Sequence, residues 1–404
     1  MIDIPIKKYN RNFPCDNSNF GAVIDTTHLD SFNSIATFKK AKKEYRKISV
    51  INEKTIDRNS KALVLEKNFN VFTTTELFCL KKAIIHMPSG AVINSDGMLI
   101  QESLWGAALH GFPAFRNDRS TKWKWLFQTD CPVDQSMKDL SISYCYNRSY
   151  FQFYHFFMDC LSRYYVLDKM LDKLSDLKIL IGNFRKGSFQ TEALRLVGLN
   201  QNQILTTDDF SNELTHFSTV YFPLPVFKEN LGLKPSYKSG LHYKYLDISY
   251  FDWLRQKFFL GIKNESIIPR ACLYLKRGKG FGRSVNQEEE LINRLKIYGI
   301  VAIDPGSMPF KVQLQYFLDA ALIIAPHGAA LTHLAWTPCG CTVLELIASN
   351  YDDPSYRVIC AEKKHDHRLF LGQPDDAKDD RSNYNIDVEE IICFIKNYIL
   401  THSV

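Results

Sequence analysis

The sequence predicts an α/β protein with parallel sheets, divided into two domains. Three observations support this fold class. Short apolar runs of strand length alternate with helical segments in both halves of the chain, which is typical of parallel sheets covered by helices. Prolines and glycines cluster between residues 223 and 240 and mark a linker. At 404 residues, the chain is also longer than one ordinary hydrophobic core.

Composition and charge exclude several classes of protein. The chain is 45% hydrophobic and 23% charged, as expected for a globular protein. Its formal charge of +6 is small for this length, so polyanionic ligands such as nucleotides fit and a nucleic-acid partner is not expected. The 10 cysteines are scattered, which favours reduced thiols over disulfides or a zinc site. Without an apolar leader or a run of membrane-span length, we expect a cytoplasmic protein.

Residues 1–60 form an N-terminal extension whose role the sequence does not define. Its basic run, Lys39–Lys47, is typical of a solvated helix face, and a contact with anionic lipid is the alternative. We expect the N-terminal domain at residues 61–230. Its first strands are predicted at 62–65, 83–85, 91–93 and 98–100, with a hairpin turn at Asn94–Gly97.

A helix at 149–169 is the most informative element of this domain. On a helical wheel its polar residues share a stripe roughly 100° wide, and most of the remaining surface is aromatic or apolar. This stripe contains Gln152, His155, Asp159, Ser162 and Arg163. Because so apolar a helix is buried, the stripe must face satisfied partners or a cleft. His155 and Asp159 are four residues apart, so the carboxylate can orient the imidazole; a structural pair capping a nearby loop is the alternative.

Strands and helices continue to alternate as far as the linker that begins at residue 223. Strands are predicted at 178–182, 203–205 and 219–222, with a helix at 189–197. The C-terminal domain, residues 231–404, begins with a helix at 249–260 and a strand at 271–275. That strand runs into Lys276–Arg283, a glycine-rich basic loop in which Arg277 and Arg283 can clamp a phosphate with paired N–H groups. A solvated surface loop is the alternative. Helices at 288–295 and 310–318 flank a strand at 299–303.

The stretch from 320 to 347 is the centre of this domain. Ala321–Pro326 and Cys341–Ile347 are apolar runs that predict strands buried on both faces, and Leu331–Trp336 between them reads as a short helix. The intervening turn, His327–Ala330, has small residues that let the backbone approach a ligand. Free N–H groups and the helix dipole meet there, which suits a pyrophosphate. Glu345, near the end of the second strand, is placed to accept hydrogen bonds from ribose hydroxyls. An ordinary βαβ unit is the alternative.

After residue 347 the sequence is less informative. We expect a strand at 358–360, a polar loop containing His365 and His367, and a C-terminal helix at 388–400. The histidines and aspartates of this loop have no regular ligand spacing, so no metal site is predicted. Adjacent acid pairs at 208–209, 352–353 and 375–376 fall in apparent loops.

In their order and spacing, these segments resemble glycosyltransferase family 61 over roughly residues 60–400. The resemblance is carried by the His155-to-Asp159 helix, the strand-arginine loop with Arg277, Arg283, Asn286 and Glu288, the helix with Phe310 and Gln313, and Pro326–Ala329 followed by Val343–Leu346. Three positions depart from the family pattern. Ala330 stands where glycine is common, Gln287 where an acid is common, and Phe156 where tryptophan is common.

The resemblance implies the GT-B architecture, in which two facing Rossmann-like domains with parallel sheets enclose a cleft. It further implies an inverting hexosyl- or pentosyltransferase that is metal-independent and needs no cofactor. Such an enzyme moves a sugar from a nucleotide donor, commonly a UDP-sugar, to a hydroxyl of a glycan or glycolipid acceptor. By this analogy the product is a capsule- or lipopolysaccharide-type glycan made on the cytoplasmic side, with peripheral contact to the inner face of the membrane as a further expectation.

The same resemblance implies roles for individual residues. The expected donor-binding residues are Arg277 and Arg283 at the phosphates, His327, Gly328 and Ala329 under the pyrophosphate, Glu345 at the ribose, and also Asn286 and Gln313. His155 and Asp159 are the expected catalytic pair, and either can be the base. The alternative from another class is a nucleotide- or sugar-binding protein of the same fold that has lost transfer.

Overall fold

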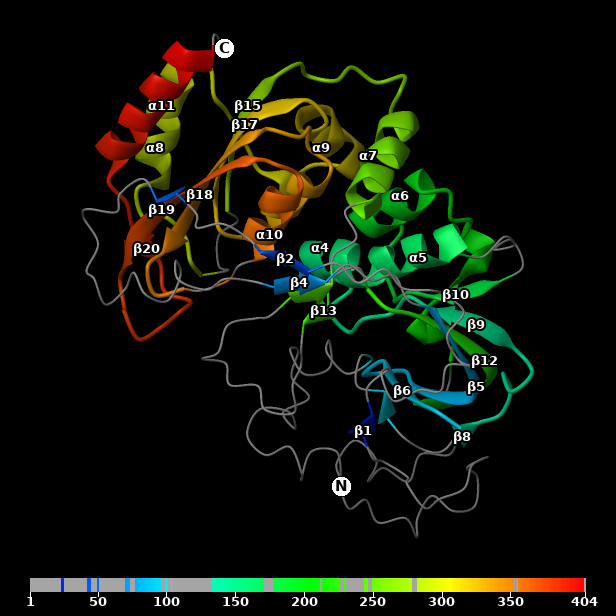
Figure 1. Ribbon diagram of the computed structural model, residues 1–404. Helices are drawn as coiled ribbons and strands as arrows, with labels where there is room; N and C mark the ends of the chain where they lie inside the picture. The colour runs from blue at the N-terminus through cyan, green and yellow to red at the C-terminus, as the bar shows by residue number, and fades with distance from the viewer. Residues whose placement is uncertain are drawn as a thin grey trace.

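The computed structural model describes residues 23–24, 42–44, 49–50, 70–72, 77–95, 99–100, 103, 133–170, 177–210, 213–225, 228–229, 243–245, 249–277, 282–351, 353 and 355–402. Its strands form three sheets, and a layer of helices lies between the two larger ones (Figure 1). The strand predicted at 62–65 lies outside the described residues. No helix in the described part of the chain is long and apolar enough to cross a membrane.

The first sheet, in the N-terminal half, is mixed rather than parallel throughout as predicted. In spatial order its strands are β1 (Val23–Ile24), β7 (Leu99–Ile100), β6 (Ala91–Ile93), β5 (Leu77–His86), β12 (Leu214–Pro223), β9 (Ser141–Tyr144), β10 (Lys178–Leu180) and β11 (Ile204–Leu205), with β8 (Val133–Asp134) also on β12. β12, β9, β10 and β11 run parallel, whereas β12, β5, β6 and β7 pair antiparallel. Short turns join β5 to β6 and β6 to β7, and turns this short can connect only antiparallel strands.

The second sheet, in the C-terminal half, is parallel except at one edge. In spatial order its strands are β16 (Val301–Ile303), β15 (Ala271–Leu275), β17 (Ala320–Pro326), β18 (Thr342–Ala348), β19 (Asp366–Pro374) and β20 (Tyr384–Asn385), with β3 (Ser49–Val50) also on β19. Among the described strands of this sheet, β19 and β20 pair antiparallel and the other pairs are parallel. β15 and β18 are buried along their whole length, as expected for parallel strands with helices on both faces.

Two predictions after residue 347 are wrong. Residues 358–360 lie in helix α10 (Ser355–Glu362) rather than in a strand. Their β-branched side chains favour a strand locally, but Asp353 accepts a hydrogen bond from the Ser355 backbone N–H at 2.9 Å and thereby caps a helix start. The predicted polar loop contains strand β19 instead. The first three residues of β19 are polar and not buried, and this beginning concealed the strand.

The N-terminal extension contributes strands to all three sheets. β1 pairs with β7, and β3 pairs with β19. The third sheet has the order β13 (Lys228–Glu229), β14 (Tyr243–Tyr245), β4 (Asn70–Phe72) and β2 (Lys42–Glu44). β2 lies within the basic run that was predicted to be a helix face, so that prediction is wrong for Lys42–Glu44. The rest of the run lies outside the described residues.

The helices that were predicted between 149 and 338 all form. They are α4 (Phe153–His155), the π-helical segment η7 (Phe156–Leu161), α5 (Ser162–Met170), α6 (Phe189–Leu196), α7 (Ser249–Gly261), α8 (Glu288–Leu295), α9 (Phe310–Phe317) and the 3₁₀ helix η12 (Ala329–Ala335). Short 3₁₀ turns and the C-terminal helix complete the set: η8 (Gln201–Gln203), η9 (Thr207–Asp209), η10 (Lys296–Tyr298), η11 (Pro305–Ser307) and α11 (Val388–His402). The π-helical segment was not predicted, and such segments often occur at functional sites.

One aromatic core joins the two halves of the molecule. Phe157, on η7, lies 4.8 Å from the Trp336 ring and 5.5 Å from the Phe310 ring, both from the C-terminal half. It also stacks on Phe189 of α6 at 6.1 Å between centroids. The helix layer between the two sheets in Figure 1 is therefore a continuous hydrophobic core. This core fixes the α4–η7–α5 helix against the turn after β17.

Candidate functional site

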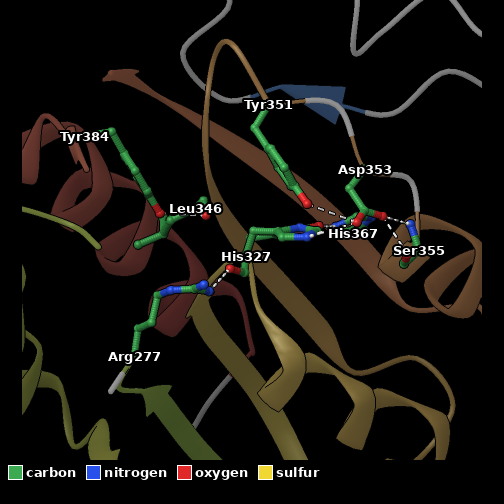
Figure 2. A network of polar contacts seen from close by, with 9 residues as sticks. Arg277, His327, Leu346, Tyr351, Asp353, Ser355, His367 and Tyr384 are labelled. Atoms are coloured by element: carbon green, nitrogen blue, oxygen red, sulfur yellow. Dashed lines mark hydrogen bonds and ion pairs between the residues drawn. The ribbon is translucent and has the colours of Figure 1, made fainter. Parts of the chain in front are cut away.

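Arg277 links the end of β15 to the turn after β17. Its Nε donates a hydrogen bond to the Gly282 carbonyl oxygen at 2.7 Å, and its Nη1 donates to the carbonyl oxygen of His327 (Figure 2). A Cβ on Gly328 would collide with this guanidinium. Any larger residue at this position would displace the Arg277 guanidinium from its present place.

Arg283 lies close to Arg277 and stacks on Tyr351, with Cζ 4.2 Å from the ring centroid. Its Nε and Nη1 are buried and have no hydrogen-bond partner among the described residues. Within the described part of the chain, neither Arg277 nor Arg283 forms an ion pair with a carboxylate, in contrast to Arg294 and Arg368. Burial, and next the charge of Arg283, lower the pKa of Arg277. Two such guanidiniums form a site that attracts an anion.

His327 is buried between two carboxylates. Its Nδ1 lies 2.5 Å from Oε1 of Glu345, and its Nε2 lies 3.6 Å from Oδ2 of Asp353. Although burial disfavours the charged imidazole, Asp353 and Glu345 raise the pKa of His327 above its usual value. Tyr351 and His367 lie beside this pair of contacts (Figure 2). His327 thus belongs to a charged network rather than to an open turn.

Both carboxylate oxygens of Glu345 are engaged within the protein. Oε1 contacts His327, and Oε2 lies 2.8 Å from Nε2 of His367. Burial alone would raise the pKa of Glu345, but the two histidines lower it to about 2. With 2% of its surface exposed, Glu345 has neither the access nor the free oxygens for the expected ribose contact. We therefore assign it to the support of His327.

Three other predicted donor-binding residues differ from their expected setting. Two of them have side chains that are hydrogen-bonded within the protein, and the third begins a short 3₁₀ helix. Asn286 donates from Nδ2 to both carboxylate oxygens of Asp375, at 2.9 and 3.1 Å. Gln313 is buried, and its Nε2 donates to the carbonyl oxygens of Pro305 and Met308, each at 2.8 Å. Ala329 is exposed at the start of η12, which is a 3₁₀ helix of 7 residues. So short a helix has a weak dipole, and any anion here depends mainly on the arginines.

The pair His155 and Asp159 forms as its spacing predicted. Nδ1 of His155 lies 2.8 Å from Oδ2 of Asp159, and the two side chains are 14% and 9% exposed. Two other residues of the predicted stripe, Ser162 and Arg163, are engaged by other partners. Arg163 donates to the carbonyl oxygens of Asp159 and Pro223 and covers the rings of Tyr144 and Phe222, and Ser162 donates to Met158. The π-helical segment contains Asp159 and ends immediately before these two residues.

A series of ring contacts connects His155 to His327. The ring of His155 lies 5.3 Å from that of Tyr154, and Tyr154 lies 5.8 Å from Tyr356 on α10. Tyr356 in turn lies 5.0 Å from His327. The structure therefore brings the predicted catalytic pair and the predicted turn together from opposite halves of the chain.

Four site residues were missed by the sequence prediction: Tyr351, Asp353, Tyr356 and His367. They come from the segment after β18, from α10 and from β19, where the predicted secondary structure was wrong. The sequence analysis noted the adjacent acid pair at 352–353 and His367, but placed both in loops without a partner. Among the residues that the structure describes, no group of three or more His, Cys, Asp or Glu side chains is arranged to hold a metal ion.

A family comparison covers most of these residues. The Glycosyltransferase 61 family model matches residues 153–344, from the first residue of α4 into β18. A search of curated proteins finds no match. The matched range contains the His155 pair, both arginines and the His327 turn, whereas Glu345 and the four missed residues lie beyond its end. This chain therefore contains a glycosyltransferase family 61 domain at residues 153–344, and glycosyltransferases in general act on a sugar donor and an acceptor.

Proposed function

We propose that this glycosyltransferase transfers a sugar, with inversion, from a nucleotide donor to a hydroxyl of a glycan or glycolipid acceptor. The observation that carries the proposal is the pair of guanidiniums at the end of β15, neither of which has a carboxylate partner among the described residues. A nucleoside diphosphate supplies the missing negative charge. We take UDP as the expected nucleotide, and a GT-B arrangement of the two larger sheets as the expected architecture.

Transfer requires that the leaving diphosphate be stabilised as its bond to the sugar breaks. Arg277 and Arg283 are cations held by backbone carbonyls and by an aromatic ring, so they are already in place when charge develops. Gly328 lies beside the Arg277 guanidinium, and in this proposal the backbone N–H groups of Gly328 and Ala329 add donors to the same site. Asn286, Gln313 and Glu345 contribute by shaping the surrounding loops, since their polar groups contact protein atoms.

The acceptor hydroxyl must lose a proton as its oxygen attacks the anomeric carbon. We assign the base to His155, supported by Asp159. Nδ1 of His155 donates to Asp159, so the proton is taken at Nε2, and the carboxylate then stabilises the imidazolium. The new bond joins the acceptor oxygen to the sugar, the bond to the diphosphate breaks, and the nucleoside diphosphate leaves. We further propose a capsule- or lipopolysaccharide-type product made at the cytoplasmic face of a membrane.

Turnover separates this proposal from a nucleotide- or sugar-binding protein without activity. Nucleoside diphosphates and their sugars are first screened by thermal shift, because a ligand at a hundred times its Kd stabilises the fold by about 2.7 kcal/mol. The sugar nucleotides that stabilise the protein are then incubated with glycan acceptors, and released nucleoside diphosphate is measured. Stabilisation without release over the whole panel would favour the binding protein.

Arg283→Ala is expected to weaken nucleoside diphosphate binding by about 1.5–3 kcal/mol, roughly a 10- to 150-fold rise in Kd, because charge-assisted hydrogen bonds are lost. This variant is cleaner than Arg277→Ala, since Arg277 also donates to two backbone carbonyls. Isothermal calorimetry measures the Kd of the nucleoside diphosphate for the unmodified chain and for the Arg283 variant. The control is Arg294→Ala, which removes an arginine paired with Glu389 on the surface. Equal affinity in the Arg283 variant and the control would remove Arg283 from the donor site.

Transfer is expected to continue at its full rate in excess EDTA, since the guanidiniums can neutralise the leaving diphosphate. Rates with and without EDTA, and after addition of Mn²⁺, check this expectation. Activity that is lost with EDTA and restored by Mn²⁺ would contradict it. That result would direct attention to the acid pair at 352–353, because Asp353 already lies beside His327.

A further inference from the structure

Both ring nitrogens of His327 face carboxylates. Nδ1 lies 2.5 Å from Glu345, and Nε2 lies 3.6 Å from Asp353. A neutral imidazole has one N–H and would turn a lone pair toward one of these carboxylates. Only the imidazolium presents an N–H to each. The buried position of His327 makes this choice matter, since a lone pair facing a carboxylate away from water is strongly unfavourable.

His367 shows the opposite arrangement on the same carboxylate. Its Nε2 lies 2.8 Å from Oε2 of Glu345, whereas its Nδ1 is buried and has no hydrogen-bond partner among the described residues. A proton on Nδ1 would therefore be a buried, unsatisfied donor. His367 thus makes one contact within the network, through Nε2, whereas His327 makes two, one through each ring nitrogen.

Asp353 connects this charge to both arginines. Its Oδ1 accepts hydrogen bonds from the Ser355 backbone N–H at 2.9 Å and the Ser355 hydroxyl at 2.5 Å. Its Oδ2 accepts from the Tyr351 hydroxyl at 3.3 Å and faces His327 (Figure 2). Tyr351 carries the guanidinium of Arg283, and the His327 carbonyl oxygen holds Arg277. A single carboxylate therefore touches the supports of both cations.

We infer that Asp353 is a positioning residue that holds His327 as an imidazolium, and that this cation adds a third positive charge to the two guanidiniums of the donor site. The inference rests on the proposed function for its role in donor binding, but the charge state of His327 does not depend on that function. The ring does not contact the donor, because both nitrogens point to carboxylates. His327 acts instead through its charge and through the backbone carbonyl that orients Arg277.

The titratable and charged groups around His327 come from several elements. Glu345 lies on β18, Asp353 and Tyr351 precede α10, Tyr356 lies on α10, His367 lies beyond Glu345 on β19, and Arg277 meets the carbonyl oxygen from β15. The two carboxylates raise the pKa of His327 against the effect of burial. The positive charge is therefore present at low pH and is lost as the pH rises through this raised pKa. Anion affinity should fall in the same direction.

The charge state is tested without any ligand. With ¹⁵N-labelled histidine, long-range ¹H–¹⁵N spectra distinguish imidazolium from either neutral tautomer, and a His327→Gln variant assigns the signals. In the unmodified chain His327 is expected to remain an imidazolium at pH 7.5. In Asp353→Asn its titration midpoint is expected to fall by about 1–3 pH units, the usual effect of an opposite charge at this range. Asp380→Asn, at an exposed site, is the control and should leave the midpoint unchanged.

A second arm measures the effect on binding. The Kd of UDP is determined from pH 6 to 9 for the unmodified chain, Asp353→Asn and Asp380→Asn. Inorganic pyrophosphate is the probe that lacks a nucleoside. In Asp353→Asn the loss of affinity with rising pH is expected to begin at lower pH by the same interval. Because the titration of the ligand itself is common to all proteins, it cancels in the ratio of their constants. A purely structural role would lower affinity equally at every pH.

The outcomes separate the inference from the proposed function. A neutral His327 in the unmodified chain at pH 7.5 overturns the inference, even if Asp353→Asn does not fold. An imidazolium whose midpoint is unmoved in folded Asp353→Asn overturns the role of Asp353. If the midpoint moves but neither UDP nor pyrophosphate binds any of the proteins, the network stands and the proposed donor site fails. A shifted midpoint with a matching shift in affinity supports both.

Discussion

His155→Ala and Asp159→Asn are each expected to fold, to bind nucleoside diphosphate normally and to lose at least ~100-fold in kcat, because removal of a general base costs about 10²–10⁴ in rate. In His155→Ala no group remains to accept the acceptor proton at that position. In Asp159→Asn the new amide can donate to Nδ1, which moves the imidazole proton to Nε2 and leaves no lone pair for the acceptor. Arg163 still donates to the backbone carbonyl of residue 159, so the helix is retained.

Single-turnover rates and nucleoside diphosphate affinity, measured on the same preparations, separate chemistry from binding. His402→Ala, at an exposed position near the end of α11, is the control for a histidine outside the site. The pH dependence of the rate gives a further check, since a base must be deprotonated to act. If both variants transfer sugar within a few-fold of the unmodified chain, the pair is structural and the base lies elsewhere.

The fold could be predicted where local sequence dominates. β15, β17 and β18 were found because they are continuous apolar runs, and the helix at 153–170 because its aromatic residues occupy most of its surface. β19 and α10 were not, because hydrogen bonds made far along the chain or at a cap outweigh local propensity. In the mixed first sheet, the antiparallel pair β6–β7 confirms the hairpin predicted at Asn94–Gly97, whereas the antiparallel pairing of β5 with the distant β12 has no local sequence signal.

For the candidate site, contacts within one helix could be predicted from the sequence, whereas contacts between distant segments could not. His155 and Asp159 share one helix, so their spacing alone predicted the contact that forms at 2.8 Å. The environment of Glu345 could not be predicted in this way, since His327 and His367 reach it from two other segments. A carboxylate at the end of a buried strand was therefore interpreted as a ligand for ribose. Its buried oxygens instead belong to the histidines.

The aromatic core between the two halves leads to the final prediction. Trp336 is fully buried at the end of η12, and the rings of Phe157, Phe258 and Phe310 lie 4.8, 5.1 and 6.0 Å from it. Its Nε1 has no hydrogen-bond partner among the described residues, so its contribution is packing rather than polar contact. Trp336→Ala is expected to lower the free energy of unfolding by about 3–5 kcal/mol, as in other large-to-small core substitutions. The hydrogen bond from Arg255 to the carbonyl oxygen of residue 336 is kept.

Because Phe157 belongs to the N-terminal half and Trp336 to the C-terminal half, this loss should affect the whole molecule. Urea unfolding followed by fluorescence and by circular dichroism is expected to give coincident transitions in the unmodified chain, since one hydrophobic cluster joins both sheets. In Trp336→Ala the midpoint should fall for both probes together. Leu400→Ala, at a side chain that is 81% exposed, is the control and should leave the midpoint unchanged. Two separate transitions, of which only that of the C-terminal half shifts in Trp336→Ala, would show that the halves fold independently. The aromatic core would then not position His155 against the donor site.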